Sequence, residues 1–368
     1  MKPINRLLSI SSVPLSSAIK SLFIFRTIYS PRRLWNYLVV IVSMHLSKIL
    51  RRPIVWGYPP ILMVEPTNIC NLKCPMCPSG NGDMKRQKGQ LDLDSFKGLM
   101  DDVGAYIYQV QFWNQGEPFI NKNILEFIKY AKSKGVVTQT STNGHFIRDV
   151  AAAEALVSSG LDQIIFSMDG TNEESYEKYR VGGDFNLVLD TLGRILEAKR
   201  KLKSRTPLIQ LQFLVFKHNQ DEIEQLIELA KKHRINRISF KSAQVYSRDQ
   251  AQEFLPDDPE FLRYENQSDE LVLKGGLPNW CSRLWLNSTI NWDGSVSPCC
   301  FDKDAEFAFG NCFASDNSFK QIWKNDKYQN FRKQVLRDRK NIPICCNCNE
   351  GLPQPFAKIL ELPDADPS

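Results

Sequence analysis

The sequence has few cysteines and no long uninterrupted apolar segment, so it lacks the features of a disulfide-rich or a membrane-spanning protein. Ten cysteines and four histidines occur among 368 residues. That cysteine content is too low for a disulfide scaffold. The longest apolar stretch, Leu34 to Leu50, contains Asn36, His45 and Lys48, and it falls short of the ~20 apolar residues that a spanning helix needs. The composition, with 42% hydrophobic and 24% charged residues, is that of a globular protein long enough for two domains.

Acidic residues are absent from the first 64 positions, where nine Lys or Arg occur. The basic charge of the chain therefore belongs to an N-terminal arm, and the remainder is mildly acidic. The serines and the proline in the segment LLSISSVPLSSAIK argue against a secretory signal. An organellar transit peptide, which is also rich in Arg and Ser, stays open. We expect a cytoplasmic protein, with peripheral contact at the inner membrane surface as a second interpretation.

The segment from Leu34 to Leu50 is predicted to form a helix. Its apolar residues at helical spacing share one face; they are Trp35, Leu38, Val42, Leu46 and Ile49. We expect this face to dock on the body of the protein. The alternative is a helix that lies in a membrane interface with a basic rim, because Arg32, Arg33, Arg51 and Arg52 flank it.

Between residues 60 and 241, short apolar runs alternate with amphipathic stretches. This alternation predicts a parallel sheet with crossover helices. Six strands are expected, at residues 61–64, 108–113, 136–141, 163–168, 208–216 and 237–241. Unusual loops follow the first four: CNLKCPMC, GEP, STNG and SMDG. Loops at the carboxyl ends of parallel barrel strands meet at one mouth, so we expect these four to build one site.

Cys70, Cys74 and Cys77 form a CxxxCxxC group that has no fourth thiol nearby. A structural metal site with no open coordination position usually has four protein ligands. Three soft thiolates suit an iron-sulfur cluster with one iron left open for a substrate or cofactor. Zinc bound by three cysteines and a distant histidine is the alternative, and no histidine lies close to this group in the sequence.

With these motifs in this order, the segment 60–241 resembles the radical S-adenosylmethionine (radical SAM) superfamily. The resemblance implies a partial (βα)6 barrel similar to a TIM barrel, in which S-adenosylmethionine chelates the open iron of a 4Fe-4S cluster. Reductive cleavage of this cofactor would give a 5'-deoxyadenosyl radical that abstracts hydrogen from a substrate. The resemblance also implies a set of cofactor-binding residues: Met76, Gly116, Glu117, Asn143, Ser167 and Asp169. Met76 departs from the family, which often has an aromatic residue before the third cysteine.

The remaining seven cysteines lie after residue 276, beyond the predicted barrel. INWDGSVSPC predicts a hairpin with a turn at Asp293-Gly294, and residues 319–336 predict a helix. The spacing of the cysteines resembles the SPASM/twitch type of extension, which implies an auxiliary 4Fe-4S cluster. We predict one such cluster, with four ligands: Cys281, Cys299, Cys345 and Cys348. Cys300 and Cys346 adjoin two of these ligands and stay open as alternatives, Cys312 is expected to be a buried hydrophobe, and a structural zinc is the alternative metal.

These patterns together predict three parts: a basic helical arm (1–58), a radical SAM partial barrel (59–275) and an auxiliary-cluster domain (276–368). The expected function is radical SAM chemistry on a peptide or small-molecule substrate, for oxidation or cross-linking. The competing hypothesis is a non-enzymatic metal-binding or electron-transfer protein. A reductase with flavodoxin, or a ferredoxin, is the expected electron donor, and a nucleic acid partner is not expected.

Overall fold

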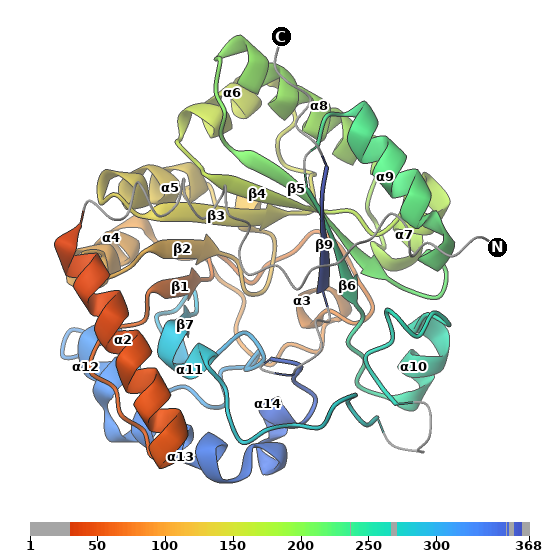
Figure 1. The fold of residues 1–368 in the computed structure, drawn as a ribbon. Coiled ribbons are helices and arrows are strands. Elements are labelled where there is room, and N and C mark those ends of the chain that lie inside the picture. Colours follow the sequence, from red (N-terminus) through yellow and green to blue (C-terminus); the bar gives the residue numbers. More distant parts are fainter. Residues whose placement is uncertain (1–29, 236, 266–270, 351, 353–356, 363–368) are drawn as a thin grey trace.

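A curved sheet forms the centre of the molecule, with helices on its outer side (Figure 1). The computed structural model describes residues 30–235, 237–265, 271–350, 352 and 357–362. Within these residues the sheet has nine strands, in the order β8-β7-β1-β2-β3-β4-β5-β6-β9. The strands are β1 (Ile61–Val64), β2 (Gln109–Phe112), β3 (Val137–Thr142), β4 (Gln163–Ser167), β5 (Leu208–Val215), β6 (Arg237–Ser242), β7 (Asn287–Ile290), β8 (Val296–Ser297) and β9 (Ala357–Glu361).

Strands β1 to β6 lie next to one another in chain order and are parallel, which confirms the predicted α/β fold with a partial (βα)6 barrel. The helices that cover the outer side of the sheet (Figure 1) are α4 (Leu93–Val103), α5 (Ile124–Ser133), α6 (Val150–Ser158), α8 (Phe185–Lys201) and α9 (Ile223–Lys232). The short helices α3 (Pro78–Asn81) and α7 (Glu173–Tyr179) lie inside the loops that follow β1 and β4, so both are close to the mouth of the barrel.

The two sides of the sheet differ in chemistry. Residues that point to the helices, such as Val110, Phe112 and Phe166, are fully buried in the main hydrophobic core. On the opposite, inner side the side-chain amide of Gln109 donates to Gln139, and that of Gln163 donates to Gln210. The inner side is therefore polar, unlike the branched apolar filling that is common inside complete barrels.

The C-terminal part joins the barrel sheet at both edges. Strand β7 pairs with β1 in parallel and forms a hairpin with β8, and β9 pairs antiparallel with β6. Gly294 has a φ of +87°, as the predicted Asp293-Gly294 turn requires. The helix predicted over 319–336 is broken at Asn325 into α12 (Phe319–Lys324) and α13 (Asp326–Asp338). The other helices here are α10 (Arg248–Phe254), α11 (Arg283–Leu286) and α14 (Pro343–Cys346).

Helix α2 (Pro31–Leu50) is the described part of the predicted N-terminal arm, and residues 1–29 lie outside the described residues. It packs on the body of the protein, but through the face opposite to the predicted one. Its buried residues are Arg33, Asn36, Val40, Ser43, Met44 and Ser47. Trp35 and Ile49, which were expected to dock, are 68% and 74% exposed. The prediction of the docking face was wrong, because polar contacts rather than the apolar stripe anchor this helix.

No helix within the described ranges combines the length and the apolar content needed to cross a bilayer.

Candidate functional site

The first cysteine group lies on the loop between β1 and α3. Cys77 is the N-cap residue of α3, and Gly80 packs so closely on this loop that a Cβ there would lie 2.6 Å from the backbone nitrogen of Cys74. Burial raises the pKa of Cys70 to about 11 and also raises the pKa of Cys74. Metal ligation requires thiolates, so the positive charge of bound iron must favour their ionisation here.

The loop after β2 lies directly on the cysteine loop. Gly116 has a φ of +74°, and a Cβ at this position would lie 2.5 Å from the carbonyl oxygen of Thr67 and 2.7 Å from that of Ile69. The backbone N–H of Glu117 donates to the Ile69 carbonyl over 2.8 Å. Only glycine fits this approach, and the backbone at Gly116 is thereby held beside Cys70.

The buried carboxylate of Glu117 ties the end of β2 to the end of β3. Its Oε2 accepts from the backbone N–H of Asn143 over 2.7 Å, and its Oε1 accepts from the hydroxyl of Thr142 over 3.0 Å. Burial raises the pKa of Glu117 to about 7. The expected contact of this carboxylate with the ammonium group of S-adenosylmethionine stays a prediction. What the structure shows is a carboxylate that positions the loop after β3.

Asn143 reaches from that loop to the cysteine loop. Its Nδ2 donates to Oδ1 of Asn71 over 2.7 Å and lies 3.9 Å from Sγ of Cys70. Ser167 ends β4 on the inner side of the barrel, and Met76 is buried in a small apolar cluster that includes Leu72. The structure thus brings Met76, Gly116, Glu117 and Asn143 to the first cysteine group, as the loop order predicts.

Asp169 lies near the same cysteine group and forms an ion pair with Arg180, a residue that the sequence analysis did not single out. Its carboxylate is fully buried and bonded to the guanidinium of Arg180 over 2.6 Å, while its other oxygen accepts from the backbone N–H of Leu214 over 2.7 Å. Nη1 of Arg180 lies 3.9 Å from Sγ of Cys74. The predicted contact of Asp169 with the cofactor stays a prediction. Its observed partner is a cation that faces the cysteine.

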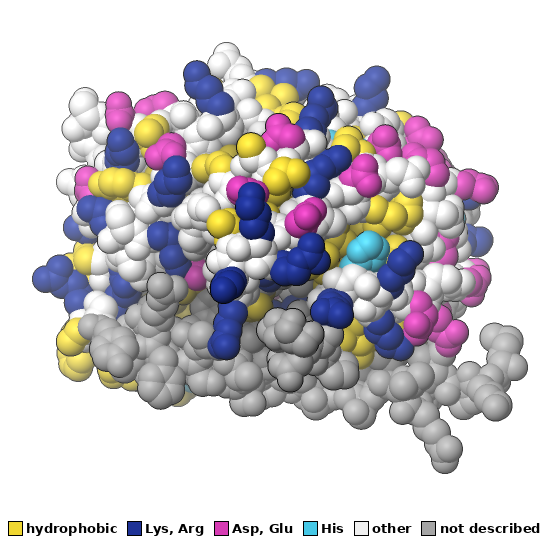
Figure 2. All heavy atoms as spheres, turned by 90° about the horizontal axis from the view of Figure 1, so that it is seen from above, with side chains coloured by type: hydrophobic (Ala, Val, Ile, Leu, Met, Phe, Trp, Pro, Cys, Tyr) yellow, Lys and Arg dark blue, Asp and Glu magenta, His cyan; other side chains and the backbone are white. Residues whose placement is uncertain are grey.

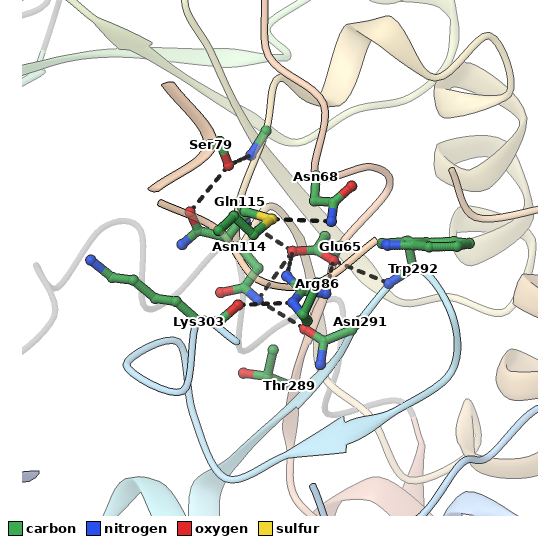
Figure 3. Close-up of polar contacts among 12 residues, drawn as sticks. Glu65, Asn68, Ser79, Arg86, Asn114, Gln115, Thr289, Asn291, Trp292 and Lys303 are labelled. Carbon is green, nitrogen blue, oxygen red and sulfur yellow. Dashed lines mark hydrogen bonds and ion pairs between the residues drawn. The ribbon is translucent and has the colours of Figure 1, made fainter. Parts of the chain in front are cut away.

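A second buried ion pair joins the cysteine loop to the C-terminal hairpin (Figure 3). Both carboxylate oxygens of Glu65, at the end of β1, accept from Arg86 over 2.7 and 2.8 Å. Glu65 also accepts from the backbone N–H groups of Gln115 and Trp292, and Nε of Arg86 donates to the carbonyl of Lys303. The loop after β2, the cysteine loop and the C-terminal part are therefore fixed relative to one another.

The second cysteine group gathers beside α11 and α14. Cys345 and Cys348 lie on one turn, where the backbone N–H of Cys348 donates to the carbonyl of Cys345 over 3.0 Å. Burial raises the pKa of Cys299, and the thiols of Cys300, Cys348 and Cys281 raise it further. Ligation of one cluster by Cys281, Cys299, Cys345 and Cys348 stays a prediction.

Two other cysteines are less suited to ligation. Cys346 is exposed, and its thiol donates to the carbonyl of Pro343 over 3.1 Å. Burial raises the pKa of Cys312 to about 12, and the ionisable groups that act on it are Asp102 and Asp293 rather than a cysteine. Within the pair of neighbours in α14, the buried Cys345 is thus the better ligand, and Cys312 stands apart from the group.

Arginine side chains also face the second group. Nη2 of Arg339, a fully buried residue, donates to Sγ of Cys348 over 3.5 Å. Nη1 of Arg283 donates to Sγ of Cys300 over 3.7 Å. Together with Arg180 at Cys74, these contacts place positive charge where thiolate ligands carry negative charge. Positive groups that contact the ligand sulfurs in this way change the net charge and the reduction potential of a cluster.

In the described part of the chain, no three His, Cys, Asp or Glu side chains converge as the ligands of one metal ion would. Both ring nitrogens of His145, the histidine next to Asn143, are engaged, one by the Asn143 carbonyl and one by the backbone N–H of Asp184. This histidine is not free to complete a zinc site.

A cavity of about 320 Å³ is lined by residues that adjoin cysteines of both groups and by charged residues such as Asp83, Lys85 and Lys303. Met76 and Pro78 line it from the first cysteine loop, and Phe301 and Ile344 line it beside the second group. A molecule in this cavity would contact segments that carry both groups.

Comparison with known proteins assigns these features to a family. Residues 64–230 match the model of the radical SAM superfamily, and residues 281–349 match the model of the SPASM iron-sulfur cluster-binding domain. The chain contains a radical SAM domain followed by a SPASM domain. Its SPASM match contains all seven C-terminal cysteines and ends one residue after Cys348.

Relatives and solved structures agree with this assignment. Fe-coproporphyrin III synthase of Methanosarcina barkeri is 31% identical over 182 residues, which cover 49% of this chain but only 43% of the synthase. PqqA peptide cyclase of Gluconobacter oxydans is 25% identical over 285 residues, covering 72% of this chain and 76% of the cyclase. The structure of Streptococcus suis SuiB bound to S-adenosylmethionine has a TM-score of 0.58 at 16% identity, covers 83% of this chain and 74% of SuiB, and shows a shared fold.

This radical SAM protein is therefore an enzyme that uses a 4Fe-4S cluster, S-adenosylmethionine and an auxiliary iron-sulfur centre. The non-enzymatic alternative is not favoured by the family matches. The roles of individual cysteines as ligands, the contacts with S-adenosylmethionine and the domain boundaries stay predictions.

Proposed function

We propose that this radical SAM enzyme oxidises or cross-links a peptide that binds between its two cysteine groups. In this proposal Cys70, Cys74 and Cys77 hold the cluster that binds S-adenosylmethionine, and Cys281, Cys299, Cys345 and Cys348 hold one auxiliary cluster. The bound cofactors supply one-electron reduction and hydrogen abstraction, and the protein positions the substrate and excludes water.

The observation that carries the proposal is the cavity that residues next to both cysteine groups line. Met76 and Pro78 adjoin Cys77, and Phe301 directly follows Cys300. An oxidation requires that the substrate, after losing a hydrogen atom, also loses an electron. In this proposal an auxiliary cluster near the cavity accepts that electron.

The inner wall of the barrel supports a peptide as substrate. Gln212 and Ser239 lie side by side on β5 and β6. Within the described residues no hydrogen bond engages the side chain of Gln212. A free side-chain amide matches the donors and acceptors of a peptide backbone. PqqA peptide cyclase, a relative over most of its length, is named for a peptide substrate.

The double variant Cys281→Ala and Cys299→Ala tests the proposed role of the auxiliary cluster. We expect formation of 5'-deoxyadenosine to persist in part, because the first cysteine group is intact, while formation of the oxidised product falls by at least about 100-fold. The measurement is anaerobic turnover with the reconstituted enzyme, with 5'-deoxyadenosine and product quantified by mass spectrometry.

The matched control is Cys300→Ala with Cys346→Ala, which removes the two neighbouring thiols that we do not assign as ligands. This control should retain the auxiliary cluster and most of the product. Equal product yield from the Cys281→Ala and Cys299→Ala enzyme and the wild type would refute an electron-accepting role. Loss of product only in the control would move the ligand assignment to the neighbouring cysteines.

We also propose a flavodoxin or ferredoxin type of protein as the electron donor, because the first step requires one electron at low potential. The ten unpaired cysteines fit a reducing compartment, and we place the enzyme in the cytoplasm. Peripheral contact with the membrane is proposed through helix α2.

A further inference from the structure

Exposed apolar side chains are concentrated on one helix of this enzyme. Residues of α2 that are large, apolar and exposed form what we term the outer face of α2: Leu34, Trp35, Leu38, Val42, Ile49 and Leu50. Elsewhere in the described residues, exposed residues of this kind, such as Val150, Leu202 and Ile359, belong to separate elements. On the face of the molecule shown in Figure 2, hydrophobic side chains lie in scattered areas among charged ones. An apolar concentration on one surface marks a contact site.

The orientation of α2 is fixed by its polar side. The guanidinium of Arg33, which is buried, donates to the carbonyl groups of Gly104, Lys134 and Gly135. Gly104 and Lys134 are the C-cap residues of α4 and α5. A cation at two helix C-termini satisfies free carbonyl groups and complements both helix dipoles. Arg33 therefore holds the first turn of α2 against the barrel.

Two further polar contacts fix the rest of the helix. Asn36 exchanges two hydrogen bonds of 2.9 Å with the backbone of Tyr58, and the hydroxyl of Ser47 both donates to and accepts from the backbone of Ile54. Because these residues lie at helical spacing, α2 cannot turn its apolar side inward without breaking all three anchors. The three polar anchors therefore hold the apolar side of α2 away from the body of the protein.

The charges on α2 and on its flanking residues are of one sign. Helix α2 contains no acidic residue, and Arg32, Lys48, Arg51 and Arg52 are exposed at its two ends. Acidic residues are absent from the first 64 positions of the sequence. A partner that covers this face should therefore offer apolar contact over the length of the helix, about 30 Å, together with negative charge at its margin.

We infer that the outer face of α2 binds the surface of an anionic lipid membrane. An interfacial helix lies in the membrane plane with its apolar side among the acyl chains and basic residues at the headgroups. The outer face of α2 has Trp35 and Ile49 near its two ends, with Leu38 and Val42 between them. Figure 1 shows α2 along one margin of the molecule.

A second copy of the chain or another protein would have to supply an apolar groove with an acidic margin. A lipid bilayer with anionic headgroups has both properties without a specific groove. The charge pattern therefore favours the membrane, and association between copies becomes an outcome of the test.

Flotation of the full-length, cluster-loaded enzyme with lipid vesicles tests this inference. The vesicles contain phosphatidylcholine alone or phosphatidylcholine with phosphatidylglycerol. We expect binding to the anionic vesicles that weakens as salt is raised. The variant with Trp35→Gln, Leu38→Gln and Ile49→Gln should bind at least about tenfold more weakly, because it removes apolar contact but leaves the basic residues. Its cleavage of S-adenosylmethionine in solution should be unchanged.

The matched control replaces three exposed apolar residues on other elements: Val150→Gln, Leu202→Gln and Ile359→Gln. It should bind vesicles as the wild type does. A wild-type enzyme that fails to float with anionic vesicles, or equal binding by the two triple variants, would overturn the inference. So would light scattering that shows a dimer in the wild type and a monomer in the Trp35 variant without any vesicle binding, because the face would then be an interface between copies.

Discussion

Replacing Cys74 by alanine is expected to abolish the reductive cleavage of S-adenosylmethionine. With two thiolates in place of three, the first cluster loses the arrangement that leaves a single iron open. Cys74 is also the most buried thiol of the three, and its backbone is pressed against Gly80. Iron content should fall by about four atoms per chain, the content of one cubane. Anaerobic assays of 5'-deoxyadenosine, together with iron and sulfide analysis, measure both effects.

Cys346→Ala is the control for that variant, because Cys346 is an exposed thiol outside the proposed ligand sets. It should retain full iron content and cleavage. If Cys74→Ala still cleaved S-adenosylmethionine at a rate near that of the wild type, the first cysteine group would not be the site of this chemistry.

The second large effect is expected at Arg180, which the structure assigns as a positioning residue for the first cluster. Arg180→Met leaves the buried carboxylate of Asp169 without its partner and removes the cation beside Cys74. Breaking a buried ion pair by removing one partner costs roughly 3–5 kcal/mol in the free energy of unfolding. Loss of an outer contact to a metal ligand lowers activity by about 10- to 100-fold.

The double variant Arg180→Met with Asp169→Asn separates these two effects. It leaves no uncompensated buried charge, so chemical denaturation should show that much of the lost stability returns. The reduction potential of the first cluster should be lower in the single variant Arg180→Met than in the wild type, because Asp169 keeps its negative charge while the cation beside Cys74 is gone. In the double variant, which loses both charges, the potential should return toward the wild-type value. An Arg180→Met enzyme with wild-type potential and cleavage would show that Arg180 has only a structural role.

Much of the barrel could be predicted from the sequence because each strand is a short apolar run bounded by turn residues. The run ILMV is β1 at the predicted bounds, and QIIFSM differs from β4 by one residue. The motif loops could be placed at one mouth because parallel strands end at the same edge of the sheet. The cysteine groups are predicted from their spacing together with the resemblance to radical SAM and SPASM/twitch proteins, and their roles as ligands stay predictions.

What the sequence did not reveal depends on contacts between distant residues. Arg180, Arg283 and Arg339 occur in unremarkable segments, and only the fold brings them to cysteine sulfurs. The spacing of apolar residues predicts the position of α2 but not which of its faces is buried. The buried face is set by Arg33, which donates to the C-terminal carbonyl groups of α4 and α5. Both helices lie far from Arg33 in the sequence, so the spacing of apolar residues in α2 cannot reveal this contact. Strand β9 was missed because AKILE mixes charged and apolar residues, as a half-exposed edge strand does.

The most direct test of the account is the paramagnetic spectrum of the reduced first cluster before and after S-adenosylmethionine is added. The enzyme with Cys281→Ala and Cys299→Ala is the best material, because the auxiliary cluster should then not contribute. The account predicts a reduced-cluster signal that changes on addition of S-adenosylmethionine, as the cofactor binds the open iron. A signal that stays the same, or protein that takes up zinc in place of iron and sulfide, would contradict it.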